Sequence, residues 1–592
     1  MAKAKRVRAQ RSASTSDAGA DGSLGEWLHF LGAVPADADW IPVWPPDAFA
    51  IAAALLRRTG AYVRLVNGSP SRNKKPAGGR TACAVGAAWR QTLEAALQEG
   101  KSSGRLREAC PPEIKQWWAH MQRCRTRALA TCADDGDLIA AAVNLCIAGD
   151  AACKEIGIVV DRDPFLLVAE SVLGHNDRRS LCLHVPVEKL AVLPKRHTPQ
   201  RGCTIRSLTH NLALFTPTEI RAFWQAPYEA AAGDLDIFNL LLLPWPVRVR
   251  PGDFRVALDK SGGRIPALSV NQRYFDYEPA AVEKPARLAA RVEQALAIAT
   301  REVDRIHGVV LPELSLTRDQ FAAVERVAVK WRAILISGIR SGGSRQTNGM
   351  PSNACAIQPL GLTALRELTT SAGRIADLTR KVQSKHHRWC LDRGQILQYE
   401  LGGRLPPERD CWEHMFIGDR EIHFLTFSSW LTTCVLICED LARQDPVTEV
   451  IRSVGPNLVF ALLMDGPQLR NRWPSRYASV FAEDPGCSVL SITSLGMARM
   501  SKLSPTSGDV VDKSSTIALW RDAIYGEREI ALGPGHDACV LSLVNRTAQE
   551  FTIDGRLESR QASFPVYANI LPFSTVQASP SARRPRNAYT ES

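Results

Sequence analysis

The feature that most constrains the fold is an alternation of apolar strands and amphipathic helices from about residue 235 onward. The runs IFNLLLLPWPVRV and VVLPELSL predict strands, and PARLAARVEQALAIATREVDRIHG and DQFAAVERVAVKWR predict helices. Further strands are predicted at AILISGIR, SNACAIQPL, EIHFLTFSSW, TTCVLICED, NLVFALLMD and SVLSITSLGM. Strands that are apolar along their whole length indicate sheets covered on both faces. We therefore predict an α/β fold for residues 235–575.

The chain before this alternation has a different pattern. Its 592 residues exceed the usual size of one domain, so two or three domains are expected. Residues 24–160 are rich in Ala, Leu, Arg and Trp at helical spacing, which predicts a helical accessory region. Residues 161–234 predict a mixed strand region with a basic loop, its strands at FLLVAESVLG, SLCLHVPV and CTIRSLTHNLALF. Together they predict a mostly helical, partly β N-terminal domain.

Both ends of the chain predict disordered tails, at residues 1–23 and 576–592, because they lack an apolar pattern. Residues 1–15 carry five Lys or Arg and no acid, so much of the net charge of +12 lies in the tails. The charge is therefore weak support for nucleic-acid binding. The sequence contains no run of about 18 apolar residues and no secretory signal. We expect a cytoplasmic protein without a membrane span.

Cysteine usage and two short stretches bear on binding. The 15 Cys are scattered without a CxxC pair, which predicts reduced thiols and no metal site. The stretch LPKRHTPQRG, residues 193–202, predicts either a solvated basic loop or a contact with an anion such as phosphate. The stretch CADDGD, residues 132–137, resembles a paired-Asp metal motif, but flanking helical sequence favours helix capping or a turn.

Three polar residues lie at or near the ends of predicted strands. Glu313 is the next-to-last residue of VVLPEL, Lys385 lies in QSKHHRW, and Cys438 ends TTCVLIC. A thiol can attack an acyl carbon, a carboxylate can take its proton, and an ammonium can stabilise the oxyanion. Strand ends are where α/β sheets usually bind ligands. Taken alone, Cys438 could instead be a core cysteine, and Lys385 part of a basic surface patch with residues 386–388.

The ordered set LPELSL, KHHRW, ICED, NLVFALLMD and RWPSRYA resembles the nitrilase (carbon–nitrogen hydrolase) superfamily over about residues 235–575. The resemblance implies an α-β-β-α sandwich with Glu313 as general base, Lys385 as oxyanion-stabilising lysine and Cys438 as nucleophile. It also implies that the backbone N–H of Glu439 is an oxyanion donor, and that Glu439 and Asp440 shape the nucleophile turn. We expect no cofactor.

One position departs from the family pattern. Many members have a second Glu about ten residues after the Lys, before an aromatic residue and a Gly. Here QILQYELGG places Gln395 at that position, with Tyr399 and Gly402 matching the later pattern. Either Gln395 replaces that Glu as a neutral partner, or Glu400 takes its role. The loss of a negative charge near Lys385 would alter turnover and substrate class.

Two functions follow as expectations. The first is a cysteine-dependent hydrolase of non-peptide carbon–nitrogen bonds in a small-molecule amide, acting through a thioester. The second is a low-turnover regulatory or binding protein that uses a nitrilase-like domain for sensing or assembly. The run LLLPWPVRV is similar to that in nitrilase-like domains that accompany bacterial defence reverse transcriptases. Anti-phage defence, and a reverse transcriptase or nucleic-acid partner, are therefore expectations by analogy. The family resemblance also implies a homo-oligomer.

Overall fold

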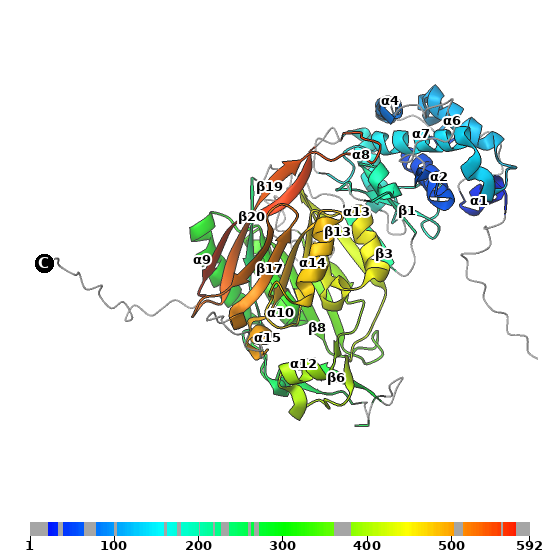
Figure 1. The fold of residues 1–592 in the computed structure, drawn as a ribbon. Coiled ribbons are helices and arrows are strands. Elements are labelled where there is room, and N and C mark those ends of the chain that lie inside the picture. The colour runs from blue at the N-terminus through cyan, green and yellow to red at the C-terminus, as the bar shows by residue number, and fades with distance from the viewer. Residues whose placement is uncertain are drawn as a thin grey trace, which may run out of the picture. The chain divides into compact units, whose positions relative to one another are not determined.

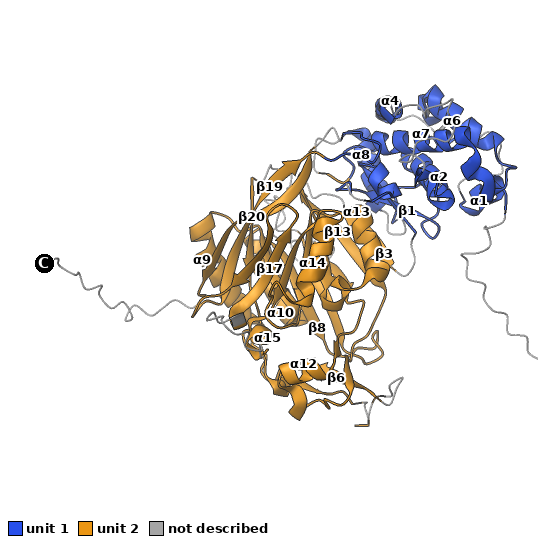
Figure 2. Ribbon diagram, viewed as in Figure 1, with its two compact units in different colours: residues 1–156, 161–217, 550–559 blue, residues 157–160, 218–549, 560–592 orange. Residues whose placement is uncertain are grey.

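In the computed structural model, the chain folds into two compact units (Figure 2). The smaller unit comprises residues 1–156, 161–217 and 550–559, and the larger unit comprises residues 157–160, 218–549 and 560–592. The structure describes residues 22–32, 40–63, 79–99, 103–158, 163–174, 179–199, 202–216, 220–225, 236–258, 262–263, 265, 271–359, 380–501, 513–557 and 561–575.

Two seven-stranded sheets form the centre of the larger unit. The first sheet has the strand order β10 (Lys381–Ser384), β9 (Ser352–Gln358), β8 (Ile334–Ser341), β7 (Gly308–Thr317), β4 (Ile237–Leu242), β19 (Ala538–Ala548) and β20 (Ala562–Phe573). The second has the order β18 (Gly526–Ala531), β17 (Thr516–Asp522), β16 (Ser488–Thr493), β15 (Leu458–Leu463), β14 (Leu431–Ile437), β13 (Arg420–Ser428) and β3 (Ile220–Gln225). Strands β4, β7 and β8 are parallel, as are β14, β15 and β16. Each parallel set therefore presents its carboxyl ends along one edge of its sheet.

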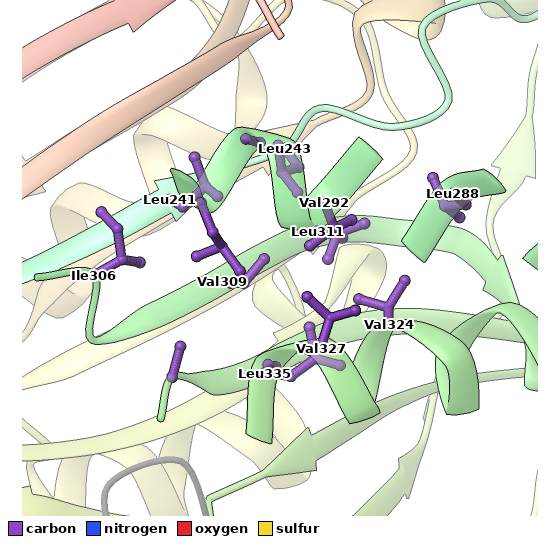
Figure 3. Close-up of a cluster of buried hydrophobic side chains, with 14 of the residues drawn as sticks. Leu241, Leu243, Leu288, Val292, Ile306, Val309, Leu311, Val324, Val327 and Leu335 are labelled. Atoms are coloured by element: carbon purple, nitrogen blue, oxygen red, sulfur yellow. The ribbon is translucent and has the colours of Figure 1, made fainter. Parts of the chain in front are cut away.

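Two helices cover the first sheet. α9 (Pro285–Val303) and α10 (Arg318–Lys330) pack against each other, α9 against β4, and α10 against β7 and β8. α10 begins at a capping box, in which Thr317 and Gln320 exchange side-chain to backbone hydrogen bonds. The apolar faces of both helices and the strands form one buried cluster (Figure 3). Its labelled members are Leu241, Leu243, Leu288, Val292, Ile306, Val309, Leu311, Val324, Val327 and Leu335.

The second sheet has its own helical cover. α14 (Trp473–Glu483) packs against β16 and β17, and Figure 1 shows it lying over that sheet. The inner faces of the two sheets meet where β7 packs against β15 and β16. Phe238 on β4 stacks there on Phe427 of β13, with ring centroids 6.2 Å apart. The layers are therefore helix, sheet, sheet and helix, which confirms the predicted α-β-β-α sandwich.

The larger unit also contains a four-stranded sheet that was not predicted. Its strands, in order, are β11 (Cys390–Leu391), β12 (Asp410–Glu413), β6 (Gln272–Tyr277) and β5 (Phe254–Val256). The short helix α12 (Arg393–Gln398) follows β11. Strands of two to six residues with mixed polar and aromatic side chains give little periodic signal. The sheet shares a buried cluster with Leu314 on β7 and with Met464 directly after β15, so it packs near the ends of these two strands.

The smaller unit is mostly helical. Its elements are α1 (Leu24–Phe30), α2 (Pro45–Thr59), α4 (Gly79–Gln98), α5 (Ser103–Ala109), α6 (Pro112–Arg123), α7 (Gly136–Ala152), α8 (Pro164–Gly174), β1 (Ala191–Pro194) and β2 (Leu212–Phe215). The central helix α7 is buried along most of its length and packs against α2, α4 and α6. Asp135 caps it by accepting hydrogen bonds from the N–H groups of Asp137 and Leu138, which confirms the predicted capping role of CADDGD. No helix among the described residues has the length and apolarity that a membrane span needs.

Four details of this region differ from expectation, and the first is that SLCLHVPV, residues 180–187, forms no strand. FLLVAESVLG is helix α8 and not a strand, because an apolar run alone does not separate the two; Pro164 and a cap from Asp163 to the N–H of Leu166 start the helix. The predicted boundary between residues 160 and 161 separates no compact units, because both sides belong mainly to the smaller unit. The predicted boundary between residues 234 and 235 is also displaced, because β3 pairs with β13 in the larger unit.

The predicted basic loop is buried where the structure describes it, and most of the two predicted tails lies outside the described residues. Residues 193–199 are buried, so the predicted solvated loop is wrong for that part, and residues 200–201 lie outside the described residues. Residues 1–21 and 576–592 also lie outside them, so disorder of the tails stays a prediction. Of the predicted N-terminal tail, Ser23 is described, and it caps α1.

Candidate active site

Glu313 is displayed by an irregular part of β7. Regular pairing with β8 stops after Leu311 and resumes at Leu316, so the residues between them bulge out of the ladder. Leu314 adopts a left-handed φ of 53°, which turns the backbone directly after Glu313. The bulge lies against Gly338 of β8, where an added Cβ would stand 2.4 Å from the Pro312 carbonyl oxygen. A residue without a side chain is therefore required at position 338 for Glu313 to occupy its place.

Lys385 lies one residue beyond β10 and joins two buried carboxylates. Its Nζ atom is 2.8 Å from Glu313 Oε1 and 2.6 Å from Glu413 Oε2. Asn353 on β9 donates from Nδ2 to both carboxylates, at 2.7 Å each, and its carbonyl oxygen accepts from the backbone N–H of Lys385. The backbone N–H of Trp389 also donates to Glu413. The structure thus brings Glu313 and Lys385 together in a buried network.

Glu413 is the residue that sequence reasoning missed. It lies on β12, and neither Gln395 nor Glu400 takes this place beside Lys385. Gln395 is at the start of α12, where it forms a capping box with Asp392, and Glu400 is exposed. A long and partly irregular segment separates Glu413 from Lys385, so the spacing of the two residues did not predict their contact. The only sequence clue is an acid inside the short aromatic stretch CWEHMF.

Cys438 starts the turn that follows β14. It has a left-handed φ of 48° and opens the 3₁₀ helix Cys438–Leu441, with 1% of its surface exposed. The fully buried Asp440 accepts hydrogen bonds from the backbone N–H of His386 and from His387 Nδ1. Asp440 therefore ties the cysteine turn to the segment that carries Lys385. Glu439 is partly exposed and pairs with Arg443 at 2.8 Å.

The predicted surface-patch alternative for Lys385 does not fit its surroundings. His386 is buried, and its Nε2 lies 3.0 Å from the carbonyl oxygen of Glu421. Arg388 is half-buried and donates to the carbonyl oxygen of Met415. Lys385 itself is 1% exposed. The segment therefore lies in the interior of the larger unit.

Burial and charge set the protonation of these groups. Burial raises the pKa of Cys438 well above its ordinary value, the Glu313 charge raises it further, and Lys385 partly opposes this. Burial also raises the pKa of Glu313, against Lys385 and together with Glu413. For Lys385, burial acts to lower the pKa, but the Glu313 and Glu413 charges outweigh it and hold the pKa well above the usual range. The charges of Glu313 and Lys385 therefore act in opposite directions on the pKa of the Cys438 thiol.

A second buried network lies after β15, in the electrostatic range of Cys438. Asp465 acts to raise the pKa of Cys438. It accepts hydrogen bonds from Tyr399 Oη at 2.5 Å and from Arg472 Nη2 at 2.6 Å. Tyr399 in turn accepts from the N–H of Gly466. This network fixes the β15 end beside the cysteine turn.

A cavity of about 690 Å³ opens onto the buried network. Its wall includes Asn353 and Glu413, and it continues past Leu314, Trp389 and Met464. Those three side chains give one part of the wall an apolar surface suited to a small organic ligand. The rest of the wall carries charged residues from β5, β6, β8 and the start of α10.

The described residues contain one group that could hold a metal, and it lies in the smaller unit. Ligand atoms of His120, Cys124 and Asp135 lie within 4.8 Å of one another. Asp135 already caps α7 and pairs with Arg127 at 3.0 Å. The helix cap and the ion pair therefore explain the position of Asp135 without a metal.

Comparison with known proteins gives structural matches only. No protein-family model and no curated protein matches the chain. An amidase from Nesterenkonia sp. is 11% identical, covers 52% of this chain and 90% of its own, and has a TM-score of 0.29. Saccharomyces cerevisiae Nit3, a member of branch 10 of the nitrilase superfamily, is 12% identical over 53% and 93%, with a TM-score of 0.30. A carbon–nitrogen hydrolase from Helicobacter pylori G27 is 9% identical over 50% and 86%, with a TM-score of 0.28. Each of these three solved structures matches about half of this chain.

Proposed function

We propose that the larger unit is a cysteine-dependent hydrolase of non-peptide carbon–nitrogen bonds, with small amides as substrates. The observation that carries the proposal is the buried set of Glu313, Lys385 and Glu413 in the field of Cys438. Burying three charged groups together is costly and does little for stability compared with apolar packing. Such an arrangement beside a cavity is typical of a reaction site.

The first half of the proposed reaction forms a thioester. Cys438 Sγ attacks the amide carbon while Glu313 takes the thiol proton, because the raised pKa of the thiol keeps it protonated until then. Lys385 has three N–H donors and uses two on Glu313 and Glu413, so the third is left for the developing oxyanion. The carbon–nitrogen bond then breaks, and the amine leaves with the proton held by Glu313.

The second half releases the acyl group. Glu313 takes a proton from water, and the water oxygen attacks the thioester carbon. The carbon–sulfur bond breaks, Cys438 regains its proton from Glu313, and a carboxylic acid leaves. The N–H of Glu439 supports both oxyanions in this proposal, because N–H groups in the first turn of a helix have no partner within it.

The experiment is a matched pair of cysteine variants assayed for ammonia release from a panel of small amides. Cys438→Ala is expected to abolish hydrolysis, whereas Cys434→Ala is expected to retain it. Cys434 lies on β14, the strand that leads into the Cys438 turn, and is also buried, so both variants remove a buried thiol. Denaturant unfolding of each protein verifies that the variants fold. Full turnover by Cys438→Ala protein of verified mass would remove Cys438 as the nucleophile.

The alternative of a low-turnover binding protein is not favoured. It depended on a missing negative charge at Gln395, and Glu413 supplies a carboxylate to Lys385. A cytoplasmic location, a homo-oligomer, a reverse transcriptase or nucleic-acid partner and a role in anti-phage defence stay predictions from the sequence.

A further inference from the structure

Arg340 lies one strand away from the carboxylate network. It is near the end of β8 and is the direct cross-strand partner of Asn353 on β9. Directly opposed residues in an antiparallel pair have Cβ atoms about 5 Å apart and side chains on the same face. Asn353 is the residue that donates to both Glu313 and Glu413. The Arg340 side chain therefore starts beside the proposed reaction site, and it lines the same cavity.

Arg340 uses only part of its hydrogen-bonding capacity. Its Nη1 donates to the carbonyl oxygens of Leu314 at 2.8 Å and Ser315 at 3.3 Å. No carboxylate within the described ranges forms an ion pair with it, and its other guanidinium donors have no acceptor there. Burial accordingly lowers the pKa of Arg340, against the influence of Tyr277 and the acids Asp253 and Glu278. An anion in the cavity could therefore accept hydrogen bonds from a guanidinium whose position is already fixed.

The two acids whose charges act on the pKa of Arg340 have other partners. Asp253 accepts hydrogen bonds from the backbone N–H groups of Arg250 and Ala280. Glu278 forms an ion pair with Arg255 at the exposed rim. The exposed rim pair is screened by solvent, and it leaves the Arg340 charge without a direct counter-ion.

Tyr277 adds a second unused donor. It ends β6, lines the cavity and interacts electrostatically with Arg340. Its hydroxyl is buried and has no hydrogen-bond partner among the described residues. A buried hydroxyl without a partner destabilises the fold, and a ligand oxygen would supply the missing acceptor.

We propose that Arg340 and Tyr277 form an anion subsite of the cavity, and that the substrate is an amide carrying a carboxylate. The inference rests on the proposed amidase function and names its substrate class. The carboxylate accepts from the free side of the Arg340 guanidinium and from the Tyr277 hydroxyl, while the amide reaches the network that contains Glu313 and Lys385. Monoamides of short dicarboxylic acids have this chemistry.

Binding to a protein that cannot turn over tests the subsite separately from catalysis. Calorimetric titration of Cys438→Ala protein uses succinamate, glutaramate and adipamate, with the neutral diamides of the same acids for comparison. We expect the best monoamide to bind at least tenfold more tightly than its diamide. Adding Arg340→Gln is expected to remove that preference, and adding Tyr277→Phe to reduce it severalfold. Arg287→Gln removes the same charge from the exposed side of α9, outside the cavity wall, and is expected to leave the preference unchanged.

The alternative is that Arg340 only braces the bulge through Leu314 and Ser315. Arg340→Gln would then weaken monoamide and diamide equally, and Tyr277→Phe, which leaves the brace intact, would change neither. That result, or the absence of monoamide binding, overturns the subsite. Hydrolysis of neutral amides with no effect of Arg340→Gln would overturn it while leaving the amidase function in place. Arg340-dependent monoamide binding without hydrolysis by the native protein would support the subsite and contradict the amidase function.

Discussion

Two buried lysines in similar sequence settings have different surroundings. Lys195 lies in LPKRHTPQ and Lys385 in QSKHHRW, each with a histidine close behind it, and each is 1% exposed. Lys385 Nζ contacts the carboxylates of Glu313 and Glu413 beside a cavity. Lys195 Nζ donates to the carbonyl oxygens of Arg206 and Thr209 and to the Thr209 hydroxyl.

The role of a buried lysine therefore depends on the groups that its ammonium contacts, and not on the residues next to it in the sequence. Carbonyl acceptors hold the Lys195 ammonium within the smaller unit, as part of the backbone architecture. Two carboxylates around Lys385 create a site whose protons can move during a reaction. Nearby, the buried Glu550 carboxylate contacts His197 and the backbone N–H of Thr198, which further organises the Lys195 segment.

The largest expected effect is the loss of stability and activity in Lys385→Met, with Lys195→Met for comparison. Lys385→Met leaves two buried carboxylates unpaired, so we expect the free energy of unfolding to fall by about 3–5 kcal/mol. Hydrolysis by the folded protein should fall by about 10²–10³-fold or more, because an oxyanion donor is lost. Lys195→Met should cost about 1–3 kcal/mol of stability, through carbonyl oxygens left without donors, and should retain activity. Denaturant unfolding and amide hydrolysis, measured on the same samples, check both.

The comparison breaks if the two lysine variants behave alike. Equal loss of activity would mean that Lys195 also contributes to the reaction. Undiminished activity of folded Lys385→Met protein would mean that the carboxylate pair does not serve catalysis.

A smaller effect is expected from the backbone that positions the partner of Lys385. Gly338→Ala places a Cβ within 2.6 Å of three atoms of the residues 312–314 bulge, so the bulge must move. A displacement near 1 Å of a catalytic group can cost about 10²-fold in rate. Gly342→Ala, just beyond the same strand, meets no atom within 4 Å and is the matched control. Hydrolysis at saturating amide compares them, and equal rates for the two variants would remove the positioning role of the bulge.

The smallest expected effect is a shift in pH dependence. Glu313 must be deprotonated to act as base, so hydrolysis falls as pH drops through its raised pKa. The Glu413 charge contributes to that raised pKa, so Glu413→Gln should move the acid limb of kcat/KM to lower pH. Glu400→Gln, an exposed position, should leave the limb in place. An acid limb that stays or moves upward in Glu413→Gln would contradict the coupling.

The alternation of strands and helices could be predicted from strong local signals, whereas the family resemblance implied the α-β-β-α sandwich and the roles of Glu313, Lys385 and Cys438. Long apolar strands, amphipathic helices and polar residues at strand ends each leave a pattern in a short window. Glu313, Lys385 and Cys438 lie on or directly after β7, β10 and β14. Of these three, Glu313 and Lys385 are in direct contact, with 2.8 Å between Lys385 Nζ and Glu313 Oε1.

The remaining features depend on contacts that no short window contains. Glu413 reaches Lys385 from a strand of the small sheet, and its pairing with β6 crosses more than a hundred residues. Lys195 is buried by tertiary contacts, although a charged side chain is normally predicted to be exposed. FLLVAESVLG has the apolar composition of a strand, but the Asp163 cap and Pro164 start a helix. In each case, distant or flanking residues decided what the local pattern left open.

The most direct test of the central claim is the location of the acyl group during turnover. The native protein is mixed with a hydrolysed amide, quenched rapidly in acid, and examined by intact mass and peptide mapping. We predict an added mass equal to the acyl part on the peptide that contains Cys438, lost in Cys438→Ala and retained in Cys434→Ala. An acyl group mapped to any other residue would contradict the account.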